Sequence, residues 1–274
     1  MSIPTSTRGK GPRRAVGTTE TDPSRVRGAH TLAALSTAAM RDPCDHGTFS
    51  IVACDRDQGF WGVAVSTKPP SVGAVVPWAA WRVGAVATQA MSNYHFGPRG
   101  LELLRRGLSA EDVVRRLTRS DPGRDHRQLA VVDRRGAVAA WTGSKCIEHA
   151  LHTTGDGYSC QGNMLASATV VPAMASAFEH ARGSLASRMM AALRAGAAEG
   201  GDKRGMESAA LVVVHREPWF ESIWSDRWCD VRVDRSARPI AELARLVEAD
   251  ARDTRRFLAQ HARAVARARP RTKR

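Results

Sequence analysis

Thr48–Cys54 reads TFSIVAC and Trp61–Thr67 reads WGVAVST, and these two short runs decide the fold prediction. Both have the apolar, β-branched composition that is typical of strands. Between them lies the turn-rich linker 55–59 (DRDQG), so the pair predicts a β-hairpin. The residues before it differ sharply, because 1–30 are rich in Ser, Thr, Gly, Pro and Arg and show no periodicity, which is typical of a disordered leader.

The order of the remaining predicted elements indicates a layered fold. Further strands are predicted at 72–76, 83–89, 128–133, 137–142, 208–215 and 230–234. Helices are predicted over about 98–117, with a break near Gly107 and a new start at Ser109, over about 170–198 with an interruption at Gly183, and from Pro239 into the Arg-rich end. The predicted order is hairpin strands first, helices in the middle, and late strands followed by a helix. This order fits an α/β layered architecture better than a βαβ repeat.

The net charge of +14 is concentrated at the two ends of the chain. Residues 1–47 carry seven Lys/Arg against four Asp/Glu, and residues 251–274 carry nine against one, which leaves only +3 for 48–250. We therefore predict three parts: a basic leader (1–47) that is disordered or weakly helical, a folded domain (48–250), and an Arg-rich tail (251–274) that is helical or disordered. Such tails can bind nucleic acid without sequence readout, although solvated ends are the favoured interpretation.

Cysteine usage and hydropathy narrow the class of protein further. The five cysteines are widely spaced without a CxxC pair, so neither a disulfide framework nor a structural zinc site is predicted. No stretch approaches the roughly 20 apolar residues of a membrane-spanning helix. The patch 31–40 (TLAALSTAAM) is too short and too far from the start for an export signal. We predict a cytoplasmic protein that contacts no membrane and needs no metal or cofactor.

Seven short blocks in the folded part of the chain resemble one known family. They are Thr48–Ala53 (TFSIVA), Val72–Trp78 (VGAVVPW), Gly84–Ala90 (GAVATQA), Phe96–Gly100 (FGPRG), Asp125–Leu129 (DHRQL), Gln161–Leu165 (QGNML) and Gly201–Gly205 (GDKRG). In this order they are similar to DUF1028, a widespread bacterial family of unknown function. The resemblance implies an N-terminal-nucleophile (Ntn) hydrolase-like fold, which is a four-layer α-β-β-α sandwich with two mostly antiparallel sheets. It also implies self-association, for which we expect a homodimer.

The same resemblance gives Thr48 a candidate catalytic role. In Ntn hydrolases the residue that begins the first strand attacks an amide carbonyl while its own α-amine accepts the proton. A free α-amine suits this role because its pKa lies near neutrality. The plain alternative is that Thr48 is only a β-branched residue starting a strand.

The role of Thr48 requires removal of the 47 residues that precede it, because only then is its amine free. Three explanations stay open: Thr48 attacks the Gly47 carbonyl and releases the leader, a protease trims the leader, or the start of the chain is misassigned.

Four further residues are candidates for the catalytic machinery. Lys68 ends the second strand of the hairpin and would hold the Thr48 amine neutral. Asn93 and Asn163 are candidate oxyanion donors, and Asp202 would orient the amine. Each also has a structural interpretation, since a strand-end lysine, a turn-forming asparagine and a charged loop are common in solvent.

A second group of residues is predicted to bind the substrate. Arginine recognises carboxylates through its planar fork, so the basic members suggest an amide that carries a carboxylate. The predicted substrate-binding residues are Gln89, Arg99, His126, Arg127, Gln128, Lys203 and Arg204.

The leading functional hypothesis is a cofactor-independent amide hydrolase. The alternative is a non-catalytic member of the same fold that binds a small molecule or a protein, with nucleic-acid binding by the basic tails as a third, less favoured reading.

Overall fold

The computed structural model describes residues 47–215 and 226–268, with side chains through residue 260. All of the described residues belong to one compact unit. The predicted leader, apart from Gly47, therefore lies outside the described residues.

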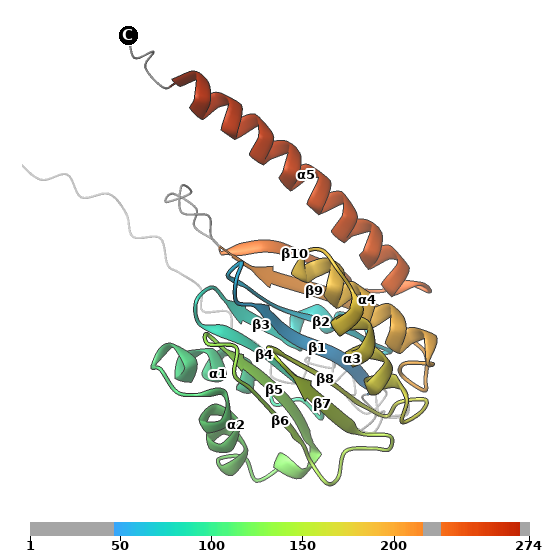
Figure 1. Ribbon diagram of the computed structural model, residues 1–274. Coiled ribbons are helices and arrows are strands. Elements are labelled where there is room, and N and C mark those ends of the chain that lie inside the picture. Colours follow the sequence, from blue (N-terminus) through green and yellow to red (C-terminus); the bar gives the residue numbers. More distant parts are fainter. Residues whose placement is uncertain (1–46, 216–225, 269–274) are drawn as a thin grey trace, which may run out of the picture. The chain divides into compact units, whose positions relative to one another are not determined.

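The described residues form ten strands in two sheets, and every strand pairing is antiparallel, as predicted. The six-stranded sheet has the order β10-β9-β2-β1-β8-β7 and the four-stranded sheet the order β3-β4-β5-β6 (Figure 1). The first contains β1 (Thr48–Asp55), β2 (Phe60–Thr67), β7 (Leu151–Gly155), β8 (Tyr158–Asn163), β9 (Ser208–Val214) and β10 (Arg227–Val233). The second contains β3 (Pro77–Ala80), β4 (Gly84–Ala90), β5 (Arg127–Asp133) and β6 (Val138–Thr142).

Five α-helices accompany the sheets: α1 (Phe96–Arg105), α2 (Ala110–Arg119), α3 (Val170–His180), α4 (Leu185–Ala198) and α5 (Pro239–Ala268). The predicted helix start at Ser109 is confirmed, because its hydroxyl accepts the Asp112 backbone N–H at 3.1 Å. The predicted breaks at Gly107 and Gly183 are also confirmed, and both glycines have positive φ. Helix α5 is continuous across residue 250, where the domain was predicted to end.

The strand predicted at 72–76 is wrong. Val72–Ala74 is instead a short 3-10 helix, η3, and the strand β3 starts at Pro77. Ser71 precedes it with a φ of 60°, and the backbone N–H groups of Val75 and Val76 donate to the Val72 carbonyl. The N–H groups of Val75 and Val76 are thus satisfied within the segment and not by a neighbouring strand. A β-branched composition alone does not reveal this turn.

Side chains from the two sheets pack against each other in one of three core clusters. Val52 and Val63 of the six-stranded sheet lie in this cluster with Ala85 and Val132 of the four-stranded sheet. Adjacent strand residues point to opposite faces, so Ile51 lies instead in the cluster that holds α3, α4 and the start of α5.

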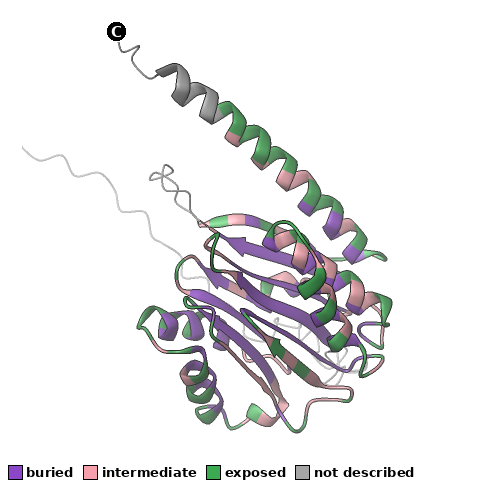
Figure 2. Cartoon of the chain, in the orientation of Figure 1, coloured by how far each residue is buried: buried purple, intermediate pink, exposed green. Residues whose placement is uncertain are grey.

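A third cluster packs α1 and α2 on the four-stranded sheet. The helices therefore lie on the sheet faces that are turned away from the other sheet, and the strands carry most of the buried residues (Figure 2). None of the described helices is long and apolar enough to cross a membrane.

Candidate functional site

Thr48 begins a central strand of the six-stranded sheet and is almost fully buried, with 4% of its surface exposed. It lies opposite Thr67 on β2 and Asn163 on β8. The Thr48 hydroxyl donates to the Thr67 hydroxyl at 3.2 Å, and the Thr67 hydroxyl in turn donates to the carbonyl oxygen of Gly47. Two hydroxyl groups therefore connect the Thr48 side chain to the peptide bond that precedes it.

The Gly47 carbonyl oxygen accepts a second hydrogen bond, from Nη2 of Arg204 at 3.1 Å. The guanidinium is fixed by Asp202, whose two oxygens accept from Arg204 Nε at 3.0 Å and Nη2 at 2.7 Å. A hydroxyl and a cationic donor on one carbonyl oxygen are an arrangement that stabilises negative charge developing there. The loop before β9 thus supplies part of the site at Gly47-Thr48.

Asp202 is the buried anion of this site, with 1% of its surface exposed. Besides Arg204, it accepts the backbone N–H of Lys68 at 3.0 Å, so it joins the end of β2 to the loop before β9. It also packs tightly on Gly47: a Cβ atom placed on this glycine would lie 2.8 Å from Asp202 Oδ1 and 2.9 Å from Met164 Cβ. The residue before Thr48 therefore has to be glycine unless its neighbours move.

The structure places Lys68 beside Asp202 but directs its ammonium group to Glu207. The Lys68 Nζ atom lies 2.6 Å from Glu207 Oε1, and both side chains are about one-third exposed. The contact of Lys68 with the site is therefore made by its main chain.

The buried side chains of Gln89, Gln128 and Asn163 form one hydrogen-bonded group that links the two sheets next to Thr48. Gln128 Oε1 accepts from Gln89 Nε2 at 2.7 Å and from Asn163 Nδ2 at 3.1 Å, and Gln89 Nε2 also lies 3.4 Å from the Thr48 carbonyl oxygen. Ser50 extends the network, donating to Gln89 Oε1 at 2.5 Å. All four side chains are at most 2% exposed. They fix the position of β1 relative to the four-stranded sheet.

Asn93 and Arg127 form a separate cluster around Asp121. Asp121 Oδ2 accepts from Asn93 Nδ2 at 3.0 Å and from Arg127 Nε at 2.9 Å. Burial acts to raise the pKa of Asp121, but the hydrogen bonds from Arg127, Asn93 and the Gly123 N–H outweigh it and hold this pKa below its usual value. The cluster connects the segment after β4 to the start of β5.

The remaining predicted site residues lie nearer the surface. Arg99 and Lys203 are exposed, and His126 is partly buried. Among the described residues, no group of three or more His, Cys, Asp or Glu side chains is placed to hold a metal ion.

Thr67 is the site residue that sequence reasoning missed. The signal was present, because β1 and β2 are hairpin strands of equal length, and such pairing places the last residue of β2 opposite the first residue of β1.

The fold and this site define a mixed α/β protein with two antiparallel sheets, in which a central strand begins at a buried threonine. The family of unknown function DUF1028 matches residues 48–243, and the chain belongs to this family. It is also similar to the crystal structure of a DUF1028 protein from Silicibacter pomeroyi, with 33% sequence identity and a TM-score of 0.65. That match covers 74% of this chain and 88% of the other. None of the curated proteins matches this chain.

Proposed function

We propose that this protein is a cofactor-independent amide hydrolase of the Ntn type, with its two sheets and flanking helices forming the four-layer sandwich of that class. The observation that carries the proposal is the double donation to the Gly47 carbonyl by Thr67 and Arg204, beside the Thr48 hydroxyl. These groups surround the one peptide bond whose cleavage would free the Thr48 amine. No metal or cofactor takes part in the proposed reaction.

The first reaction is removal of the leader. The Thr48 Oγ1 atom forms a bond to the Gly47 carbonyl carbon, and negative charge on the carbonyl oxygen is stabilised by Thr67 and Arg204. The C–N bond then breaks, and the hydroxyl proton ends on the Thr48 nitrogen, which leaves an ester. One water molecule hydrolyses the ester to a leader ending in a Gly47 carboxylate and a chain beginning at Thr48.

The second reaction is hydrolysis of an external amide by the same hydroxyl, with the freed α-amine as base. Asp202 lies within the same group of contacts and would orient the amine. Lys203 and Arg204 lie on the adjacent loop, which supports a substrate that carries a carboxylate.

We further propose a cytoplasmic homodimer. The four described cysteines are free, which fits a reducing compartment. The family resemblance supports self-association, and the molar mass in solution tests it.

The decisive experiment is intact mass with N-terminal sequencing of purified wild-type protein, Thr48→Ala and Thr48→Ser. We expect wild type and Thr48→Ser to begin at residue 48 and Thr48→Ala to keep the leader, because only the first two have a hydroxyl nucleophile. A Thr48→Ala chain that also begins at residue 48 would assign the cleavage to another protease. A wild-type chain that keeps its leader would favour the non-catalytic binding alternative, which needs no free amine.

The neighbouring residues Arg204 and Lys203 provide a matched pair for the charge-stabilising role. Arg204→Gln should slow leader removal by roughly 100-fold or more, the usual cost of losing one donor to a developing oxyanion. Lys203→Gln should leave the rate of leader removal unchanged, because that side chain is exposed. A time course of leader release measured by mass spectrometry compares the two. Equal rates in both variants would remove Arg204 from the mechanism.

A further inference from the structure

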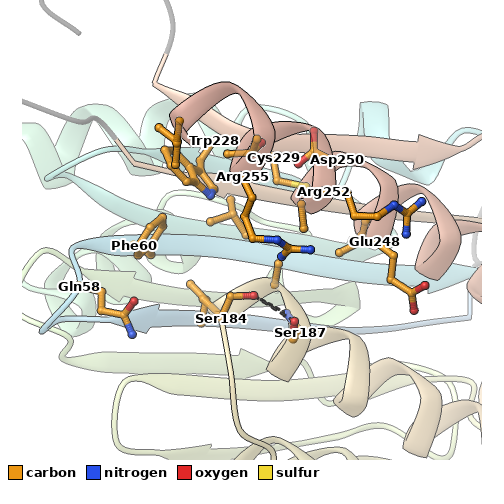
Figure 3. Close-up of a pocket in the computed structure, with 17 residues that line it drawn as sticks. Gln58, Phe60, Ser184, Ser187, Trp228, Cys229, Glu248, Asp250, Arg252 and Arg255 are labelled. Carbon is orange, nitrogen blue, oxygen red and sulfur yellow. Dashed lines mark hydrogen bonds between the residues drawn. The ribbon is translucent and has the colours of Figure 1, made fainter. Parts of the chain in front are cut away.

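A cavity of about 450 Å³ lies at the other end of the β1–β2 hairpin, away from Thr48. Phe60, which lines it, pairs with Asp55 at that end, whereas Thr67 pairs with Thr48. The cavity is lined by the start of α4, by α5 and by β2, β9 and β10 (Figure 3). Its volume is within the range of small-molecule sites, about 300–1,000 Å³. None of the residues that we place in the Thr48 site lines it.

One wall of the cavity is aromatic. Phe60 and Trp228 meet edge to face, with ring centroids 5.6 Å apart and an interplanar angle of 72°. His215 stacks on Phe60 at 4.1 Å, which holds the Phe60 ring in place. Leu185 and Val247 add aliphatic surface. Such a wall favours a flat, ring-containing ligand, since aromatic pairs gain energy beyond the area they bury.

The acidic residues of the cavity are already engaged. Glu248 lies 3.8 Å from Arg194 Nη2. Burial and the nearby Asp250 raise the pKa of the Cys229 thiol, which stays neutral and forms a hydrogen bond with Asp250.

The basic residues, in contrast, are available. Arg252 and Arg255 line the cavity from α5, and neither makes an ion pair with any residue in 47–215 or 226–260. Figure 3 shows the Arg255 side chain directed from α5 towards Ser184 and Ser187.

The start of α4 adds to this positive potential. The Ser184 hydroxyl caps the helix by accepting the Ser187 N–H at 3.3 Å. The other N–H groups of the first turn lack acceptors within the helix, and the helix dipole is positive at this end. The cationic tip of Arg255 and the helix N-terminus therefore face one another beside the aromatic wall.

We propose that this cavity binds a small aromatic carboxylate, with its ring against Phe60 and Trp228 and its carboxylate between Arg255 and the first turn of α4. The ring accounts for the aromatic wall, and the carboxylate accounts for the Arg255 guanidinium, which makes no ion pair with the residues that the structure describes. This site is independent of the Thr48 chemistry, because the two sites share no residue.

Isothermal titration calorimetry with naphthalene-2-carboxylate as the probe, and naphthalene-2-carboxamide as its neutral counterpart, tests the proposal on the full chain. Arg255→Gln is compared with Arg256→Gln, an exposed neighbour that does not line the cavity. We expect Arg255→Gln to weaken carboxylate binding roughly tenfold, as loss of one charged hydrogen bond would. Arg256→Gln should bind like wild type, and carboxamide binding should be the same in all three proteins.

Three results would overturn the proposal: no saturable binding of the carboxylate to wild type, equal weakening in both variants, or wild type binding the carboxamide as tightly as the carboxylate. Arg255 is exposed, so its substitution should not affect folding, and a thermal melt verifies this. Thr48→Ala should bind the probe like wild type, which separates this site from the proposed hydrolase.

Discussion

Gln128 shows that the role of a single residue near Thr48 is harder to predict from the sequence than the strand that contains it. The sequence predicted it as a substrate-binding residue, because it follows His126 and Arg127 in a polar group. In the structure its side chain is fully buried between the sheets, where Oε1 accepts from two amides and Nε2 donates to the Gly162 carbonyl and the Thr142 hydroxyl, each at 2.9 Å. Both faces of β5 are buried, so the alternation of its residues does not separate a core face from a solvent face.

The buried position of Gln128 predicts a large effect on stability. Gln128→Leu removes the acceptor of Gln89 and Asn163 and the donor to Gly162, and each unsatisfied buried group costs about 1–3 kcal/mol. We expect the free energy of unfolding to fall by about 2–5 kcal/mol in urea denaturation. Gln260→Leu, an exposed position on α5, should change it by less than about 0.5 kcal/mol. Similar stabilities of the two variants would contradict the structural role.

At the scale of elements, the sequence predicted the helices and strands whose own residues carry a clear pattern. The two hairpins are apolar runs around turns, and α2 begins at a capping serine, so both could be predicted. Strand β8 was missed because its sequence, YSCQGN, has the polar residues of a loop. Those residues are buried because β1 pairs with β8 and places Ser50 opposite Gln161, whose Nε2 donates to the Ser50 hydroxyl at 2.6 Å. The partner strand, more than 100 residues away, decides the structure of this segment.

The Asp121 cluster joins two elements of the fold. The pKa of Asp121 is lowered in the folded protein, and this predicts how the stability depends on pH. A carboxyl group whose pKa is lower in the folded state contributes stability above its unfolded value, near 3.8, and loses it as the pH falls towards the folded value. Asp121→Asn should therefore lower the melting temperature at pH 7 and show a smaller further loss than wild type between about pH 5 and 3. It also leaves the largely buried Arg127 without its ion pair.

Asp156 provides the control for this pH series. Its ion pair with Arg56 is exposed, with 82% of the Asp156 side chain accessible, and such pairs contribute little to stability. The melting temperature of Asp156→Asn should follow that of wild type from pH 7 to 3. Parallel curves for Asp121→Asn and wild type would show that the Asp121 cluster does not contribute to the acid response.

At the scale of the whole molecule, local patterns predicted a layered α/β architecture, and the family resemblance implied the two antiparallel sheets. Neither predicted that Gly47, Thr67 and Arg204 would meet. Arg204 is 157 residues from Gly47 along the chain, and only the pairing of β2 with β9 brings its loop to the start of β1. The aromatic cavity was also missed, because its walls come from α4, α5 and three strands. Local periodicity identifies elements, but the sites here depend on contacts between segments far apart in sequence.

The uneven charge of the whole chain leads to the last prediction, which concerns the basic C-terminal end. Residues 261–274 contain six Lys/Arg and no Asp/Glu, and their removal leaves the aromatic cavity intact because its last lining residue is Leu258. For a single strand such as poly(dT), the logarithm of the binding constant should fall linearly with the logarithm of the salt concentration. The slope should be about −0.7 for each phosphate contact. Deleting 261–274 should make this slope shallower by up to about 4, whereas Thr48→Ala should leave it unchanged. Fluorescence anisotropy between 50 and 200 mM salt measures both slopes. Equal slopes for the full and shortened chains would mean that this basic end makes no phosphate contacts, while a slope altered by Thr48→Ala would place nucleic acid at the proposed catalytic site.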